Sequence, residues 1–217
     1  MSDATEAGSA GRFRGRLRRF LKRKLGFLKD RIRFPRIRRY RPSKIEMPAV
    51  LLDEQSAWRG LESIVPAIIK DFKIGTDSCL EFGVEFGYST VAFSNLFSEV
   101  TGVDIFLGDE HTIFHGDHFE VTSTKLSRFE NIHLHKNDFR DWIKNDQKNY
   151  DLVHVDIVHT YEATYECGLW SARHSTCTLF HDTESFPEVR RAVYDIARQT
   201  KKRFYNYPLY HGLGIVV

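Results

Sequence analysis

The chain has 217 residues, 41% hydrophobic and 28% charged, which suits one α/β domain with a modest extension. No stretch approaches the roughly 18–20 apolar residues needed to span a bilayer. No apolar run of about 7–15 residues follows the charged N-terminus, so we expect no secretory signal. Three widely spaced cysteines argue against a disulfide framework, and we therefore expect a cytoplasmic protein.

The net charge of +3 conceals an uneven distribution. Residues 1–45 carry 16 Lys/Arg against 3 Asp/Glu, whereas residues 46–217 carry 16 against 26. We therefore divide the chain into a basic arm with its linker, residues 1–45, and an acidic folded domain, residues 46–217.

The basic arm has the pattern of an amphipathic helix. Apolar residues recur at steps of three and four from Phe13 to Ile32, with arginine and lysine between them, and Pro35 is expected to end the helix. Such a helix can lie on an anionic membrane surface, pack on the domain or a partner, or bind nucleic acid. The acidic domain and the absence of a recognised nucleic-acid-binding motif weigh against the last use. The sequence leaves peripheral membrane contact and the oligomeric state open.

The domain has an alternating α/β pattern. A helical pattern over Ser56–Phe72 opens it, and short apolar runs then alternate with helical stretches, which predicts a mostly parallel sheet with helices between its strands. The predicted strands are Ser78–Phe82, Val100–Ile105, Asn131–His135, Tyr150–Asp156, Thr176–His181, Phe204–Tyr207 and Leu213–Val217, the last two forming a hairpin-like end.

A glycine turn with an acid before it follows the first predicted strand. Glu81, Gly83 and Gly87 stand in the spacing E-x-G-x-x-x-G, with a helix expected to begin near Ser89. Two glycines let the backbone approach a ligand, but a dinucleotide site has three around its pyrophosphate. An acid at Glu81 suits a ligand that carries an ammonium group, such as S-adenosylmethionine.

Two further acids stand at the ends of the next strands. Asp104 comes 21 positions after Gly83, where an acid can accept hydrogen bonds from ribose hydroxyls. Asp138 precedes Phe139, and this pair can hold and stack an adenine ring.

From about Asp77 to Val217 the chain resembles the class I S-adenosylmethionine-dependent methyltransferases, in the bacterial branch associated with glycan and natural-product biosynthesis. The resemblance lies in Leu80–Thr90, GVDIFLGDEHTIFHGDH, DLVHVDIVHTYEATYECGLW and LFHDTESFPEVRRAV. It implies a Rossmann-like, mostly parallel seven-stranded sheet with helices on both faces, and a small-molecule or glycan hydroxyl as methyl acceptor. The implied cofactor residues are Glu81, Gly83, Tyr88, Ser89, Asp104, Asp138 and Asp156.

The resemblance also implies a divalent metal, usually magnesium. Its ligands would be Asp156 and Asp182, with His181 adjacent, because hard cations prefer carboxylate oxygens. The catalytic residues that we expect are His159 as general base, or as a residue linked to the metal, together with His181 and Asp182. A cap or turn role is the alternative for each histidine.

Ile157 departs from the resemblance, since relatives commonly have glycine at this position. A β-branched residue does not readily take a glycine-like backbone, so cofactor affinity and metal use are in question. The cluster of His111, His115 and His118 offers acceptor contact, a zinc site or a plain polar loop.

Three other functions compete with methyl transfer to a small molecule. A nicotinamide-dependent oxidoreductase is disfavoured by the missing third glycine. A non-catalytic binding or scaffold protein with this fold is kept open by Ile157. An RNA methyltransferase is suggested by the arm and opposed by the acidic domain.

Overall fold

The computed structural model describes residues 32, 34, 36–108 and 116–217, which divide into two units, Met1–Ile37 and Arg38–Val217. Most of the predicted amphipathic helix lies outside the described residues, so it stays a prediction. The second unit contains the folded domain.

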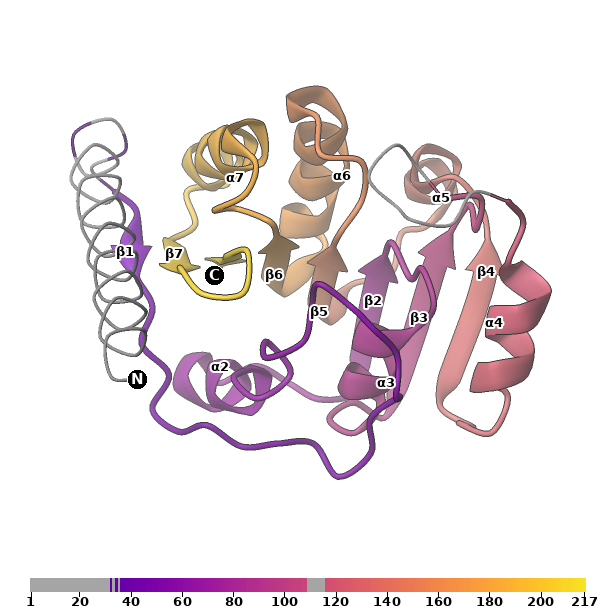
Figure 1. Ribbon diagram of the computed structural model, residues 1–217. Helices are drawn as coiled ribbons and strands as arrows, with labels where there is room; N and C mark the ends of the chain where they lie inside the picture. The colour runs from indigo at the N-terminus through magenta and orange to yellow at the C-terminus, as the bar shows by residue number, and fades with distance from the viewer. Residues whose placement is uncertain (1–31, 33, 35, 109–115) are drawn as a thin grey trace, which may run out of the picture. The chain divides into compact units, whose positions relative to one another are not determined.

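An eight-stranded sheet forms the centre of this unit (Figure 1). Its spatial order is β1-β7-β8-β6-β5-β2-β3-β4, and all neighbouring pairs are parallel except those that include β8. The strands are β1 (Arg38–Arg39), β2 (Ser78–Phe82), β3 (Glu99–Asp104), β4 (Ile132–Lys136), β5 (Tyr150–Val155), β6 (Ser175–His181), β7 (Phe204–Tyr207) and β8 (Leu213–Val216).

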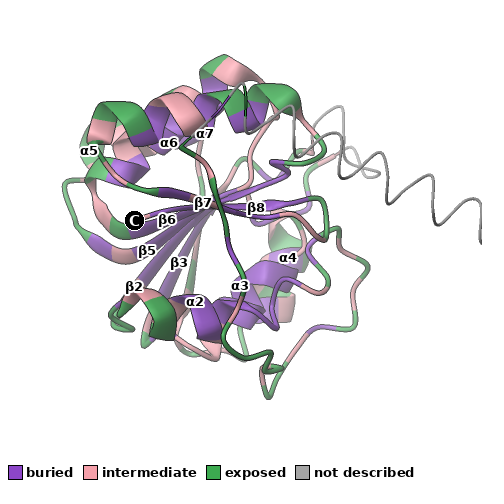
Figure 2. Cartoon of the chain, turned by 90° about the vertical axis from the view of Figure 1, so that its left-hand side faces the viewer, coloured by how far each residue is buried: buried purple, intermediate pink, exposed green. Residues whose placement is uncertain are grey.

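Helices cover both faces of the sheet, as expected (Figures 1 and 2). One layer contains α5 (Phe139–Asn145), α6 (Tyr161–Arg173) and α7 (Pro187–Thr200), and the other contains α2 (Val65–Phe72), α3 (Tyr88–Ser94) and α4 (Phe119–Leu126). Two of these helices begin at recognisable residues: the Thr160 hydroxyl accepts a hydrogen bond from the backbone N–H of Ala163, and Pro187 opens α7. The mostly parallel α/β architecture is thus confirmed.

The seven predicted strands are all present, and β1 is an addition. It pairs with β7 inside the segment that the sequence indicates as linker, with Arg38 opposite Tyr205. Two basic residues have no alternating pattern, so their sequence gives no strand signal. Tyr40, which follows, is buried, and its hydroxyl donates to Asp71 at 2.8 Å. Residues 38–40 therefore pack with the folded unit.

The first predicted helix is shorter than its pattern. Residues 57–64 form turns in which Leu61 N–H donates to Trp58 and Ile64 N–H to Leu61, and the regular helix begins only at Val65. Gly60 has a φ of +104°, which breaks helical geometry, and Pro66 suits a first helical turn. This irregular segment brings Trp58 to the sheet.

The order of the strands positions a ligand site. Within the sheet, β3 and β4 lie on one side of β2, whereas β5 and β6 lie on its other side. Such a reversal opens a crevice at the carboxyl ends of the strands. The strands beneath are rigidly packed, since Leu80, Phe82, Leu152 and Leu179 have no exposed surface.

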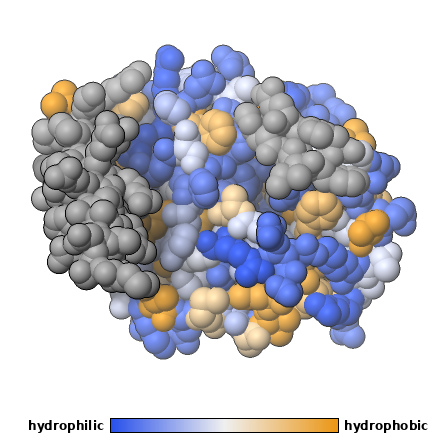
Figure 3. All heavy atoms as spheres, in the orientation of Figure 1, coloured by the Kyte–Doolittle hydropathy of each residue, from blue (hydrophilic) through white to orange (hydrophobic). Residues whose placement is uncertain are grey.

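None of the described helices is both long and apolar enough to cross a membrane. Cys79, Cys167 and Cys177 are buried free thiols. On the face in Figure 3 most described side chains are hydrophilic, and apolar ones gather toward the lower edge, where the segment before α2 runs. Ile45, Met47 and Val50 of that segment are exposed.

Candidate active site

A cavity of about 890 Å³ lies at the carboxyl ends of the central strands. That volume is within the roughly 300–1,000 Å³ typical of small-molecule sites. The predicted site residues that line it are Gly83, Tyr88, Ser89, Asp104, Asp138, Asp156, His159, His181 and Asp182. Residues that stand up to about a hundred positions apart in the sequence therefore meet in one hollow.

The glycine turn runs directly against the end of β5. Gly83 has a φ of +89°, and a Cβ at this position would lie 1.7 Å from the carbonyl oxygen of Asp156. Its N–H donates to Val103, and Asp156 N–H donates to Phe82. Only glycine fits this crossing point, and the turn is thereby fixed at the cavity floor.

Asp104 holds the same turn through its carboxylate. One oxygen accepts from the N–H groups of Val84 at 2.7 Å and Glu85 at 2.9 Å, and the other accepts from Phe106 at 2.7 Å. A carboxylate has about four lone-pair sites, so capacity for a further donor remains. The predicted ribose contact is compatible with this geometry and stays a prediction.

Glu81 does not line the cavity. It is fully buried beneath the turn, where one carboxylate oxygen accepts from the Thr90 hydroxyl and the other from His154 Nδ1 at 2.9 Å. Trp58 Nε1–H donates to His154 Nε2 at 3.1 Å. Because an indole N–H can only donate, Nε2 is an acceptor and the ring proton is on Nδ1. The structure thus gives Glu81 a supporting position instead of the ammonium contact suggested by the sequence.

Trp58 and His154 were not among the predicted site residues. His154 had a usable signal, because it is the one polar residue inside the apolar run Leu152–Val155. Trp58 lines the cavity, but its helical pattern resembled that of an ordinary core residue.

Asp138 lies at the rim of the cavity as the cap of α5. Its carboxylate accepts from the backbone N–H of Arg140 at 2.7 Å, and the adjacent Phe139 is buried and also lines the hollow. The residue pair expected to hold an adenine ring therefore reaches the cavity, although Asp138 also has a capping role.

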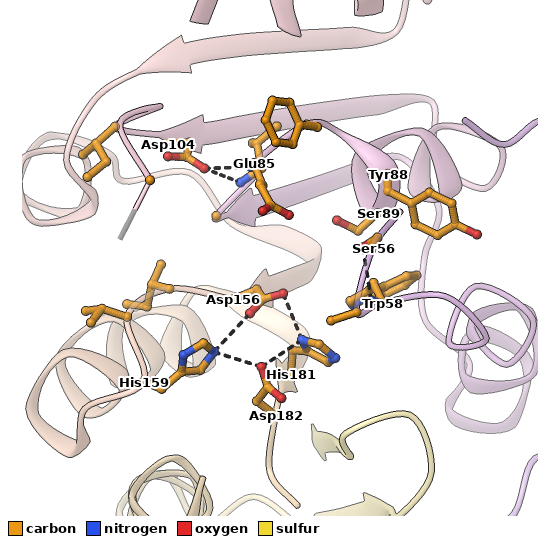
Figure 4. A pocket seen from close by; sticks show the side chains of 18 of the residues that line it. Ser56, Trp58, Glu85, Tyr88, Ser89, Asp104, Asp156, His159, His181 and Asp182 are labelled. Carbon is orange, nitrogen blue, oxygen red and sulfur yellow. Dashed lines mark hydrogen bonds and ion pairs between the residues drawn. The ribbon is translucent and has the colours of Figure 1, made fainter. Parts of the chain in front are cut away.

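Two acids and two histidines face one another at the ends of β5 and β6 (Figure 4). His181 Nδ1 lies 3.0 Å from Asp156 Oδ2 and 3.3 Å from Asp182 Oδ2. His159 Nε2 lies 2.9 Å from Asp182 Oδ2 and 3.7 Å from Asp156 Oδ1. We call these four residues the His–Asp quartet.

The quartet shifts the pKa values of its members. Burial alone would raise the pKa of Asp156, but His181 and His159 hold it far below its usual range. Burial would lower the pKa of His159, yet hydrogen bonds to Asp156 and Asp182 and their charge raise it to about 9. The pKa of His181 is also raised, because Asp156 outweighs desolvation. The His159 ring is therefore protonated at neutral pH.

Packing and backbone strain fix the quartet in place. The His159 ring stacks on Phe186 with centroids 4.1 Å apart and an interplanar angle of 5°. Asp182 has a φ of +63°, which is rare for a residue with a side chain, and its carbonyl accepts from Ser185 and Phe186 N–H. Phe186 gave no signal in the sequence, because only the fold brings it to His159.

Ile157 does not have the glycine-like conformation that the comparison with relatives suggested. It lines the cavity, and it is not among the described non-glycine residues with positive φ. The turn after β5 therefore accommodates a β-branched residue without strain at this position.

Of the three loop histidines, only His118 lies within the described residues. Its ring is buried between Phe86 and Phe106, and Nδ1 lies 3.0 Å from the Gly116 carbonyl oxygen. The zinc or acceptor roles considered for His111 and His115 fall on residues that the structure does not describe.

Residues 80–183 match a family described as "Methyltransferase domain". That segment contains the glycine turn, Asp104, Asp138 and the whole quartet. Residues 80–183 are thus similar to a methyltransferase domain. The fold around them is that of the class I S-adenosylmethionine-dependent methyltransferases.

Solved structures share this fold at low sequence identity. An O-methyltransferase from Bacillus cereus in complex with SAH is 14% identical with a TM-score of 0.58, over 76% of this chain and 82% of that one. CalS10, an amino pentose methyltransferase from Micromonospora echinaspora, is 12% identical with a TM-score of 0.55, over 75% and 91%. The O-methyltransferase NovP is 11% identical with a TM-score of 0.55, over 68% and 74%.

A curated relative is the uncharacterized protein y4gI of Sinorhizobium fredii (strain NBRC 101917 / NGR234). It is 27% identical over 154 residues, which are 63% of this chain and 16% of that protein. The chain thus corresponds to a small part of the relative's length.

Proposed function

We propose that the methyltransferase domain transfers a methyl group from S-adenosylmethionine to a hydroxyl oxygen of a small-molecule or glycan acceptor. The observation that carries this proposal is the meeting, in one cavity, of the glycine turn with Asp104 and Asp138 on one side and the His–Asp quartet on the other. One side can hold a nucleoside and the other offers proton-accepting groups. The sugar methyltransferase among the structural neighbours supports the acceptor class by analogy only.

The nucleoside half of the cofactor fits the turn side of the cavity. The cofactor supplies the methyl group on a positively charged sulfur. Asp104 has lone pairs for the ribose hydroxyls, and Asp138 and Phe139 have a carboxylate and a ring face for adenine. Gly83 keeps side-chain atoms out of the turn, so the ligand can lie against the backbone.

The quartet would activate the acceptor. A bound divalent cation supplies Lewis-acid stabilisation of the acceptor oxygen. Asp156 and Asp182 line the cavity with oxygens suited to hold it. His159 is the candidate general base: its Nε2, which lies 2.9 Å from Asp182 Oδ2, would have to be deprotonated first and could then take the hydroxyl proton, while the stacked Phe186 ring keeps the imidazole oriented.

A labelled methyl-transfer assay tests this proposal. The protein receives tritium-labelled S-adenosylmethionine with panels of sugar nucleotides, polyols, phenols, amines and structured RNA. We expect label in hydroxyl compounds. Asp182→Asn should abolish the transfer and leave the affinity for S-adenosylhomocysteine within about twofold, since Asp182 lies on the acceptor side.

Asp117→Asn is the matched control, because Asp117 is exposed and pairs with Lys136 outside the cavity lining. It should retain full transfer. Label that enters only amines or RNA would contradict the hydroxyl acceptor. Unchanged transfer by Asp182→Asn would contradict the role of the quartet.

A further inference from the structure

Asp156, His181 and Asp182 each offer one ligand atom, and the three atoms lie within 4.8 Å of one another. We infer that these residues form a site for a divalent transition metal, with the imidazole of His181 as the third ligand, and that the site prefers Co²⁺ or Zn²⁺ to Mg²⁺. A role for this metal in methyl transfer rests on the proposed function, whereas the existence of the metal-binding site does not depend on it.

The two donor-atom separations that involve His181 match those around a single ion. Metal–ligand bonds to nitrogen and oxygen are about 2.0–2.2 Å, so neighbouring ligands of one ion lie roughly 3.0–3.5 Å apart. His181 Nδ1 is 3.0 Å from Asp156 Oδ2 and 3.3 Å from Asp182 Oδ2. Little movement is needed for all three to face a common centre.

The ligand positions are set by adjoining strands. Asp156 follows β5 and His181 ends β6, and these strands pair in parallel, with Val155 opposite Phe180. The His181 side chain is only 2% exposed and that of Asp182 only 10%, so neither can swing away into solvent. The open cavity beside them leaves room for water or acceptor oxygens.

The imidazole of His181 presents a single polar edge to this centre. Nδ1 has both carboxylates as neighbours, whereas Nε2 is buried and has no hydrogen-bond partner among the described residues. His159 Nε2, 2.9 Å from Asp182 Oδ2, can orient that carboxylate from the other side. Neighbouring hydrogen bonds of this kind position the ligands of metal sites.

The nitrogen ligand decides which metal is favoured. Mg²⁺ is a hard cation that takes oxygen ligands and keeps several waters, so the two carboxylates alone would suit it. Imidazole binds zinc, iron, nickel and copper well, and affinity for mixed nitrogen and oxygen ligands rises along the first-row series. The magnesium expected from the resemblance is therefore the weaker fit.

Metal titration of the full-length protein, first stripped with EDTA, tests the inference without any methyl transfer. Calorimetry with Co²⁺, Mn²⁺, Zn²⁺ and Mg²⁺ is combined with the visible absorption of bound Co²⁺. We expect one ion per chain, a Co²⁺ spectrum with nitrogen ligation, and an affinity for Co²⁺ or Zn²⁺ on the order of 100-fold above that for Mg²⁺.

His181→Asp is the decisive variant, because it makes the ligand set all carboxylate. It should lose most of the preference and weaken Co²⁺ binding at least about tenfold, while Mg²⁺ binding is kept or gained. The control variant His133→Ala removes an exposed histidine of β4, three strands from β5, and should change nothing. The double variant His111→Ala/His115→Ala is a second control, and it too should leave metal binding unchanged.

Three results would overturn the inference: Mg²⁺ binding as tightly as Co²⁺, an unchanged preference in His181→Asp, or no metal bound by folded wild-type protein. Asp182→Asn serves as a second variant if His181→Asp does not fold, and full Co²⁺ affinity in Asp182→Asn would likewise count against the site. S-adenosylhomocysteine is titrated into the same samples. If the protein binds S-adenosylhomocysteine but not Co²⁺, the metal site is refuted and the proposed function is not. If it binds Co²⁺ but not S-adenosylhomocysteine, the proposed function is refuted and the metal site is not.

Discussion

At the scale of single residues, the buried chain from Trp58 through His154 to Glu81 links the cavity wall to the base of the glycine turn. All three side chains have at most 2% of their surface exposed, and each polar atom in the chain has a partner. A satisfied buried network of this kind is stabilising only as long as it is complete.

His154→Phe should therefore destabilise the domain strongly. It leaves one oxygen of Glu81 and the indole N–H of Trp58 buried without partners, which should cost about 3–5 kcal/mol of unfolding free energy. Urea unfolding measures this cost. Trp58→Phe, which breaks only the Trp58–His154 hydrogen bond in this network, is the control and should cost less. A His154→Phe protein as stable as wild type would refute the role of the network.

The raised pKa of His159 predicts a pH dependence of the metal-free protein. A raised pKa contributes stability that is present below the ordinary value of 6.5 and is lost as pH rises toward about 9. We expect the unfolding free energy to fall by about 2–3 kcal/mol over this range. Urea unfolding at several pH values in EDTA measures the slope, and His159→Gln should remove most of it. A wild-type slope that survives in His159→Gln would assign the effect to another group.

At the scale of elements, the sequence predicted most of the fold because buried parallel strands are continuous apolar runs. Ser78–Phe82 and Phe204–Tyr207 were predicted with their observed bounds, and the ends of the other five predicted strands differ by at most one residue. β1 could not be predicted, since pairing with β7 and not its own pattern makes it a strand. The predicted start of the first helix, at Ser56, was wrong, because Gly60 interrupts an otherwise helical spacing and α2 begins only at Val65.

The glycine turn offers a direct test at this scale. Gly83→Ala should reduce stability by about 2–4 kcal/mol or prevent folding, since its Cβ would collide with the Asp156 carbonyl and its φ is positive. Thermal unfolding measures the change. Gly214→Ala, whose Cβ would meet its nearest neighbour at 3.0 Å, is the control and should have a smaller effect. An equal loss of stability in the two variants would contradict the claim that the contact between Gly83 and the Asp156 carbonyl excludes a side chain.

At the scale of the whole domain, the site consists of strand ends that only the sheet order brings together. The acids after each strand could be placed from sequence, because parallel strands end at the same edge of a sheet. The support of Glu81 by His154 and the stacking of Phe186 on His159 could not, since they depend on side chains that meet only after folding.

Binding of S-adenosylmethionine in the cavity underlies the proposed methyl transfer. Calorimetric titration of the purified protein with S-adenosylhomocysteine, beside an NAD control and with Asp104→Ala as variant, tests it most directly. We expect micromolar binding of S-adenosylhomocysteine, none of NAD, and at least about tenfold weaker binding by Asp104→Ala, which loses a charged hydrogen-bond acceptor. A folded protein that binds no S-adenosylhomocysteine, or that binds NAD instead, would contradict it.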